Sequence, residues 1–456
     1  MRHADPHPHL SVEDQALFAE RRKALMQHLG DGTVAVIPSA RMTIRNRDVE
    51  HDFRQESTFF YLTGFDEPDS LLVLKPGAEQ AATLFVRPRD KAAETWTGRR
   101  AGVAGAVERF GLDDARPIDE IATHLPALFE GAARIAYTLG ADDETDRAVL
   151  AAQHSFWKKK PKPTKGPDTL VDLRVFSHAQ RLIKSAREIA DLQRASLITA
   201  EAHHEVMRCA RPVVNEYELQ AALEYVSRAA GATRLGYSPI VASGDNATIL
   251  HYNTNRMVIP EDALVLIDAG AEYNYVTADV TRTFPASGHF TPEQRAVYDV
   301  VLAAERASIA ACTVGSPYKN IHDISVRVLV EGLVDLGLLS GSIDELIETQ
   351  AFKRFYMHGT GHWLGMDVHD VGRYDDGKES LALRAGMVLT IEPGIYVDID
   401  DEQAPAAFRG IGVRIEDDIC VTEQGPLNLT EACVKEPEEV EEMVQSSPRF
   451  VRPVHL

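Results

Sequence analysis

Two aspartates, Asp268 and Asp279, lie on a segment whose alternating pattern predicts a β-hairpin. If Tyr273 and Asn274 form a two-residue turn, the two aspartates face each other across the hairpin. Carboxylates in direct cross-strand positions repel each other unless a cation neutralises them. A divalent metal ion would do this. A salt bridge to Arg282 and a proton shared by the two carboxylates are the alternatives.

Histidines and glycines are concentrated in one short segment further along the chain. Glycine lets a ligand approach the backbone closely, and the imidazole of histidine changes its charge near neutral pH. The cluster therefore favours metal ligation or proton transfer over a purely structural role. Its members are His358, Gly359, Gly361, His362, Gly365 and His369.

Two glutamates, Glu392 and Glu416, lie on segments that otherwise have the composition of strands. An isolated glutamate on a strand usually faces solvent. On strand alternation Arg414, Glu416 and Asp418 share one face, so ion pairing at the surface remains an alternative for this group.

Capping signals and apolar periodicity predict the elements that carry these residues. Ser185, Asn215 and Thr291 each stand three residues before a glutamate or glutamine, which is the spacing of a capping box at the start of a helix. A further helix is expected at 321–336. Strands are expected at 237–242, 263–268, 387–392 and 412–421. The order of helices followed by strands occurs twice, so we expect two halves of similar layout.

The upstream part of the chain alternates strand-like and helix-like segments, which predicts an α/β domain. A run of lysines and prolines at 158–167 cannot bury much apolar area and predicts a loop. We place the domain boundary after it, with an N-terminal α/β domain at 1–178 and a second domain at 179–456. The expected strands are 33–37, 71–74, 83–86 and 135–139, and the expected helix is 118–129.

Composition excludes several classes of protein. The chain has 456 residues and a net charge of −21, which repels nucleic acids and anionic lipids. It has no apolar run long enough to span a membrane, and Met1–Leu10 lacks the apolar core of a secretory signal. We expect a cytoplasmic protein with reduced cysteines, because no pair is closely spaced. The four cysteines are Cys209, Cys312, Cys420 and Cys433.

The order of four carboxylates and one imidazole resembles that of the aminopeptidase P and prolidase group of metallopeptidases. The similarity extends from about residue 15 to about residue 445 and includes motifs in both domains. The hairpin lacks a glycine that relatives often have, so we expect Asn274 to adopt a positive φ. The matching ligand positions are Asp268, Asp279, His362, Glu392 and Glu416. The other matching motifs are 54–57, 61–65, 96–100, 279–284, 358–362, 391–394 and 414–418.

This resemblance implies an α/β (α+β) fold, in which a creatinase/aminopeptidase P-type N-terminal domain precedes a pita-bread catalytic domain with a pseudo-twofold repeat. It also implies two divalent ions, with Mn²⁺ favoured, and a hydroxide between them as nucleophile. Glu392 would be the base. His251, His358 and His369 would hydrogen-bond the substrate and its oxyanion, and Arg414 and Tyr396 would orient the site. Asp48 and Trp96 would complete the pocket of a neighbouring subunit, which implies a homotetramer or homodimer.

The expected reaction is removal of the N-terminal residue from peptides with proline in second position. Three alternatives keep the fold. A prolidase would cut only Xaa-Pro dipeptides. A catalytically silent protein would only bind peptides, although all five ligand positions carry competent residues. A creatinase-like enzyme would need no metal, and therefore would not need Asp268 and Asp279.

Overall fold

A computed structural model of the chain describes residues 10–158 and 166–450. Two compact units make up the chain, residues 1–180 and 181–456. Most of the expected loop of lysines and prolines lies outside the described residues. Within the described ranges, every helix is too short or too polar to cross a bilayer.

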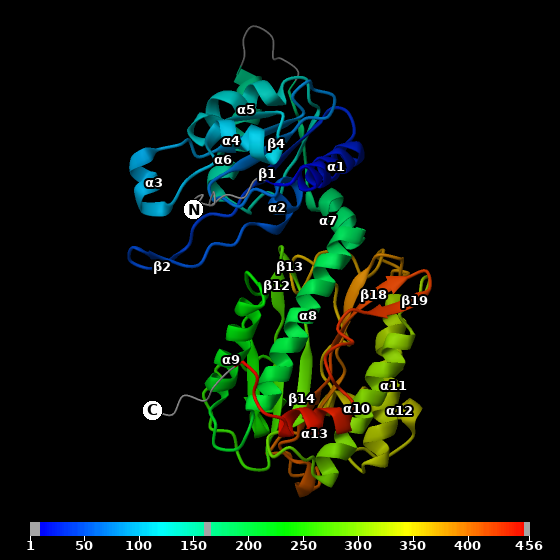
Figure 1. The fold of residues 1–456 in the computed structure, drawn as a ribbon. Coiled ribbons are helices and arrows are strands. Elements are labelled where there is room, and N and C mark those ends of the chain that lie inside the picture. The colour runs from blue at the N-terminus through cyan, green and yellow to red at the C-terminus, as the bar shows by residue number, and fades with distance from the viewer. Residues whose placement is uncertain (1–9, 159–165, 451–456) are drawn as a thin grey trace. The chain divides into compact units, whose positions relative to one another are not determined.

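The first unit is built on a six-stranded mixed sheet with the order β6-β5-β4-β1-β7-β8 (Figure 1). All residues of β4 and β5 are buried, as expected for the centre of a sheet covered on both faces. This confirms the predicted α/β class. The strands are β1 (Thr33–Pro38), β4 (Leu71–Leu74), β5 (Ala82–Val86), β6 (Asp114–Pro117), β7 (Arg134–Ala136) and β8 (Thr169–Val171). The helices are α1 (Val12–Leu29), α2 (Ser57–Thr63), α4 (Gly102–Phe110), α5 (Ile121–Phe129), α6 (Asp143–Lys158) and, across the unit boundary, α7 (Arg174–Leu182).

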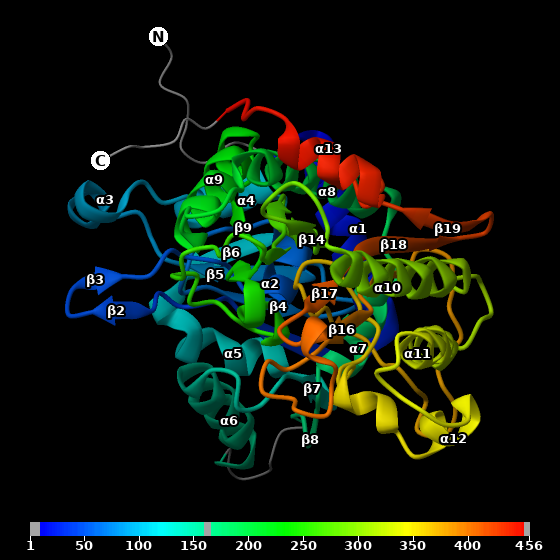
Figure 2. The same ribbon diagram turned by 90° about the horizontal axis from the view of Figure 1, so that it is seen from below.

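Two small elements project from this unit: a hairpin of β2 (Ile44–Asn46) and β3 (Val49–Glu50), and helix α3 (Lys91–Thr97). Both views place them on the same side of the unit (Figures 1 and 2). Asp48 lies exposed in the hairpin turn, and Trp96 on α3 is 88% exposed. A tryptophan this exposed is unusual for a residue with so large an apolar surface.

The first half of the second unit consists of two helices followed by antiparallel strands. Capping boxes at Ser185 and Asn215 start the two helices, as predicted. Strands β10, β11 and β14 form one sheet, and β13, β12 and β9 form another. The elements are α8 (Ala186–Cys209), α9 (Glu216–Ala229), β9 (Arg234–Leu235), β10 (Ile240–Ser243), β11 (Leu264–Asp268), β12 (Ala271–Tyr273), β13 (Val276–Thr277) and β14 (Thr281–Pro285).

The second half repeats this layout, which confirms the expected pair of similar halves. Thr291 and Gln294 form the predicted capping box, and α10 and α11 lie side by side (Figure 2). The elements are α10 (Pro292–Ala310), α11 (Tyr318–Asp335), α12 (Ile343–Glu348), β15 (Val388–Ile391), β16 (Gly394–Tyr396), β17 (Gly412–Arg414), β18 (Asp417–Thr422), β19 (Gly425–Asn428) and the last helix, α13 (Pro437–Gln445).

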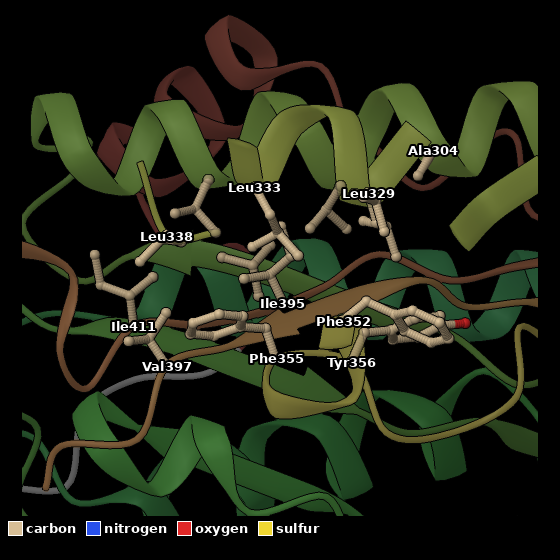
Figure 3. Packing of buried hydrophobic residues seen from close by; sticks show 14 of the residues in the cluster. Ala304, Leu329, Leu333, Leu338, Phe352, Phe355, Tyr356, Ile395, Val397 and Ile411 are labelled. Atoms are coloured by element: carbon tan, nitrogen blue, oxygen red, sulfur yellow. The ribbon is translucent and has the colours of Figure 1, made fainter. Parts of the chain in front are cut away.

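An extensive apolar cluster lies between the helices and strands of this second half (Figure 3). Leu329 and Leu333 on α11 face Ile395 on β16, and Phe355 fills the space beside them. Phe355, Leu329, Leu333 and Ile395 are all fully buried. Because the strands at this core continue into Glu416, the packing also supports a candidate ligand.

The turn of the predicted hairpin is one residue further along than expected. Tyr273 pairs with Val276, so the turn residues are Asn274 and Tyr275, with φ of 49° and 66°. Positive φ at both central positions is what a type I′ turn requires. The positive φ expected for Asn274 is therefore confirmed. The Tyr275 side chain is buried, and the guanidinium of Arg234 lies 5.5 Å from its ring centre.

The predicted pairing of the two aspartates is consequently wrong by two positions. Asp268 lies opposite Thr281, and its carboxylate neighbour Asp279 precedes β14. An even shift keeps both side chains on the same face of the hairpin, because side chains alternate with a period of two. The two carboxylates therefore still point to one side.

We predict that Leu329→Ala lowers the free energy of unfolding by about 2–5 kcal/mol, because it leaves a cavity in the packed core. Leu197→Ala on α8 is the matched control, since Leu197 is 51% exposed, and it should cost about 0.5 kcal/mol or less. Urea unfolding followed by circular dichroism measures both. Equal losses for the two variants would contradict this account of the core.

Candidate metal centre

A cavity of about 480 Å³ in the second unit collects the residues that the sequence analysis selected. Strand ends supply most of its wall. Asp268 ends β11, Asp279 precedes β14, Glu392 follows β15, and Glu416 lies between β17 and β18. His362 comes from a loop that pairs with β15. All five predicted metal ligands therefore line one cavity, and both halves of the unit contribute to it.

Three of the five are close enough to share one ion. Single ligand atoms of Asp279, His362 and Glu416 lie within 4.8 Å of one another. His362 Nε2 is 3.4 Å from Asp279 Oδ2 and 3.6 Å from Glu392 Oε1. Glu392 therefore lies beside the same imidazole, and Asp268 lines the cavity without belonging to this tight group.

Burial makes this concentration of carboxylates unfavourable without a cation. Burial raises the pKa of Asp268, Glu392 and Glu416, and their repulsion from neighbouring carboxylates raises each pKa further. Among the described residues that line the cavity, Arg414 is the single lysine or arginine. Four carboxylates facing one guanidinium leave a surplus of negative charge. An oxygen-rich donor set of this kind fits a hard or borderline divalent ion.

The same surplus of negative charge shifts the pKa of His362. Burial alone would lower the pKa of its imidazole, but the hydrogen bond and charge of Asp279, together with the charge of Glu392, raise the pKa to about 9. The imidazole therefore takes up a proton to balance part of the negative charge. A bound metal ion would replace this proton, since metal ligation needs the neutral ring.

Arg414 hydrogen-bonds one of the cavity carboxylates and two neighbouring hydroxyl groups. Its Nη2 donates to Asp268 at 2.6 Å, its Nε to Thr281 Oγ1 at 3.1 Å, and its Nη1 to the Tyr396 hydroxyl at 3.2 Å. Thr281 Oγ1 in turn donates to Glu416 Oε2 at 2.6 Å. Arg414 thus orients predicted ligands from both halves.

Two of the alternatives drawn from the sequence are wrong. The carboxylate of Asp268 pairs with Arg414 rather than Arg282, which is fully buried and pairs with Asp417 at 2.7 Å. The group of Arg414, Glu416 and Asp418 is not a surface ion cluster, because these residues are 3%, 1% and 0% exposed. Asp418 instead accepts a hydrogen bond from the backbone N–H of Asp279, at 3.1 Å.

The three other predicted histidines surround the same cavity. His358 Nε2 lies 2.8 Å from the Tyr396 hydroxyl. Burial, with the charge of Arg414, lowers the pKa of His358 to about 3, so its ring is neutral at neutral pH. His251 and His369 are exposed. The His369 ring meets the His362 ring edge to face, with centres 4.4 Å apart.

Tyr237 is a site residue that the sequence analysis missed. Its hydroxyl contacts the carboxylates of both Asp268, at 2.6 Å, and Asp279. Burial and these two carboxylates raise the pKa of the phenol well above its ordinary value, so it remains a donor. A single tyrosine before a strand carries no pattern in sequence, and only the folded positions of the two aspartates reveal its role.

The chain matches two family models. Metallopeptidase family M24 matches residues 190–423, and the N-terminal domain of aminopeptidase P matches residues 18–137. The first match covers most of the unit that holds the cavity, and the second covers most of the unit that carries Asp48 and Trp96.

Similar proteins extend over nearly the whole chain. An Xaa-Pro aminopeptidase of Escherichia coli is 42% identical over 94% of this chain and 97% of its own length. Human Xaa-Pro aminopeptidase 3 is 36% identical over 96% of this chain and 86% of its own length. The solved structure of Pseudomonas aeruginosa aminopeptidase PepP has a TM-score of 0.93 and 46% identity, and covers 94% of this chain and 98% of that one. A Zn-substituted Escherichia coli aminopeptidase P in complex with product matches with a TM-score of 0.91 and 42% identity, over 94% of this chain and 98% of that one.

We predict that Tyr237→Phe weakens the binding of Mn²⁺ by about 10–100-fold, because it removes a donor that orients two ligating carboxylates. Titration calorimetry on metal-stripped protein measures the affinity. Tyr225→Phe is the matched control, because Tyr225 is 57% exposed on α9, and it should bind as the wild type does. Unchanged affinity in Tyr237→Phe would contradict this role of the phenol.

Proposed function

The chain belongs to metallopeptidase family M24, and on that premise we propose that it removes the N-terminal residue from peptides with proline in second position. The observation that carries this proposal is the convergence of Asp268, Asp279, His362, Glu392 and Glu416 on one cavity. The similarity to Xaa-Pro aminopeptidases over 94% of the chain supports the substrate class.

The five donors would hold two divalent ions, and the oxygen-rich set supports Mn²⁺. Bound ions would supply Lewis acidity, which lowers the pKa of water and polarises the scissile carbonyl. Three oxygen or nitrogen donors lie within 4.8 Å of one another, and Asp268 and Glu392 line the same cavity.

Glu392 would act as the general base. Its carboxylate is buried, which raises its pKa and with it the affinity for a proton. It lies beside His362 and 3.8 Å from His358 Nδ1, so a proton that it accepts stays at the reacting centre. From there the proton passes to the nitrogen of the departing proline. General acid–base catalysis of this kind contributes roughly 10²–10⁴-fold to a rate.

The histidines would bind the peptide and stabilise the oxyanion. The neutral His358 ring is held at both nitrogens: Nδ1 donates to the Gly359 carbonyl at 2.7 Å, and Nε2 lies 2.8 Å from the Tyr396 hydroxyl. His251 and His369 are exposed to the cavity, as residues that contact a ligand must be. Donors aimed at a developing negative charge each supply a few kcal/mol, about 3 in a typical case.

Proline specificity would come from shape rather than from a hydrogen bond to the scissile amide. An Xaa-Pro bond has no N–H at that position, so the enzyme gains nothing from an acceptor there. A rigid wall of imidazole and aromatic rings suits the ring of proline. His251 and His369 line the cavity and are the candidates in this chain, whereas Tyr396, 2% exposed, would support the wall from behind through His358.

Asp48 and Trp96 would complete the pocket of a neighbouring subunit in a homotetramer or homodimer. Their exposure on two projecting elements of the first unit supports an intermolecular role, because a ring as large as that of Trp96 is rarely left in water. The four free cysteines support the cytoplasm as the compartment.

We predict that the protein, stripped of metal and reloaded with Mn²⁺, releases alanine from Ala-Pro-Ala at a rate comparable with its rate on Ala-Pro. Product analysis by liquid chromatography measures both rates over di-, tri- and longer peptides. Activity confined to the dipeptide would replace this proposal with a prolidase. No Mn²⁺-dependent release at all would favour a silent peptide-binding protein.

Glu392→Ala is the companion variant and should lose roughly 10²–10⁴-fold in kcat, because it removes both a ligand and the base. Glu348→Ala changes the same residue type on the exposed surface of α12 and should leave the rate unchanged. Turnover that survives Glu392→Ala would exclude this mechanism.

We also predict that two inactive variants restore each other. If Trp96 acts in a neighbouring subunit, co-expressed Trp96→Ala and Glu392→Ala chains form mixed oligomers in which some sites have both residues intact. Affinity tags of two kinds isolate the mixed oligomer, and the Ala-Pro-Ala assay measures the recovered activity. An isolated mixed oligomer without activity would contradict a role of Trp96 in a neighbouring subunit.

A further inference from the structure

His362 and His369 come from one loop, but different parts of the protein hold them. The His362 segment is part of a sheet: its N–H donates to Thr390 Oγ1 at 3.1 Å, and the Thr390 N–H donates to the His362 carbonyl at 2.9 Å. Leu364 continues the pairing by donating to the carbonyl of Val388. Strand β15 therefore fixes the position of His362.

Beyond Leu364 the loop leaves the strand, and a buried carboxylate becomes its anchor. The Asp370 side chain is 1% exposed. Its Oδ1 accepts a hydrogen bond from Arg181 Nη2 at 2.6 Å, and its Oδ2 accepts one from Lys184 Nζ at 3.0 Å. The Asp370 N–H closes the loop by donating to the carbonyl of Trp363, at 2.8 Å.

The two cations are themselves rigidly placed. The side chains of Arg181 and Lys184 are 3% and 2% exposed. The Lys184 N–H donates to the carbonyl of Gly386 at 2.7 Å, and the Gly386 N–H donates to the carbonyl of Val421 in β18. The cluster is thus tied to the sheet that carries the metal-ligand strands, through a route that does not pass through His362.

The loop backbone packs closely on the carboxylate. A Cβ atom on Gly365 would lie 2.2 Å from Asp370 Oδ2, so a side chain at this position cannot be accommodated without moving the carboxylate. The backbone between 365 and 370 therefore has little freedom to shift while Asp370 keeps both cations.

His369 has no comparable support of its own. Its ring is exposed, and among the described residues no hydrogen bond to its imidazole is found. Its one ring contact is the edge-to-face packing on His362. The next residue in the chain is Asp370, which both cations hold.

We propose that Asp370, clamped between Arg181 and Lys184, is the positioning residue that places the His369 imidazole in the cavity. This inference rests on the proposed function, in which His369 binds the peptide. A buried ion cluster that only stabilised the fold would act on every property of the site alike. A positioning residue would act only through the His369 side chain. A double-mutant cycle distinguishes this role from a general effect on the fold.

The experiment compares Asp370→Asn, His369→Ala and the double variant on Ala-Pro-Ala, all loaded with Mn²⁺. We expect Asp370→Asn to lower kcat/KM about tenfold, mainly through KM, which corresponds to 1.4 kcal/mol. In the His369→Ala background the same change should have an effect below about twofold, because the group it positions is already gone. Fully additive losses would overturn the inference.

The affinity for Mn²⁺ is the second measurement, and it does not depend on peptidase activity. Asp370→Asn should bind Mn²⁺ within about twofold of the wild type, because β15 holds His362 independently. Thr390→Val removes the acceptor of the His362 N–H and should weaken Mn²⁺ binding while Asp370→Asn does not. Equal loss of Mn²⁺ affinity in both variants would show that the cluster supports the whole site and not His369.

Three controls keep the result interpretable. Asp344→Asn disrupts an exposed ion pair with Arg327 in the same unit and should change none of the measured values. Should Asp370→Asn fail to fold, Asp370→Asn combined with Lys184→Gln removes one charge of each sign. The protein with both of these substitutions is then compared, with and without His369→Ala, in the same double-mutant cycle.

A crystal structure of the Asp370→Asn variant tests the inference even if the variant is inactive. The His369 ring should be displaced while His362 keeps its place, and an undisplaced His369 ring would overturn the inference whether or not the enzyme is active. A wild-type protein without Mn²⁺-dependent release from Ala-Pro-Ala would instead overturn the proposed function alone.

Discussion

Repulsion between buried carboxylates is the constraint on which the site depends. Asp268, Asp279, Glu392 and Glu416 line one cavity with a single guanidinium. Burial raises the cost of each charge, because water no longer screens it. The free protein lowers this cost by keeping protons on His362 and on carboxylates of raised pKa. A divalent ion removes it more completely, so affinity for metal follows from the arrangement of the ligands themselves.

Holding such a cluster together requires support from behind the ligands, and the chain uses buried ion pairs for it. Arg282 donates to the carbonyl of Glu416 and pairs with Asp417. It therefore holds Glu416 through the Glu416 backbone and through the side chain of the next residue. Asp370 with Arg181 and Lys184 has the corresponding position beside His369. Asp417 is next to Glu416 in the chain, and Asp370 is next to His369. In both cases a carboxylate with a cationic partner is therefore adjacent in sequence to a side chain that faces the cavity. Such pairs add little net stability, but they resist the displacement that the repulsion favours.

The sequence predicted the elements well where local interactions decide them. Ser185, Asn215 and Thr291 start helices because a side chain there satisfies backbone N–H groups within one turn. The hairpin register was missed, because the turn depends on Tyr275 adopting a positive φ, which is uncommon for a residue of this type. Residues that act at a distance in sequence left no local pattern. Tyr237 contacts Asp268 and Asp279 only after three segments have folded together.

The two-position error in the register shows why the convergence of the predicted ligands on one cavity could nonetheless be expected. An odd shift would have moved Asp279 to the opposite face of the hairpin, whereas an even shift retains the face. Whether the Asp279 side chain faces the cavity therefore depends on whether the register shift is odd or even, and less on which residue lies opposite Asp268. Thr281 gains the position opposite Asp268 and donates to Glu416 from there. The residue that displaced the expected partner is thus the link between a predicted ligand of the first half and a predicted ligand of the second.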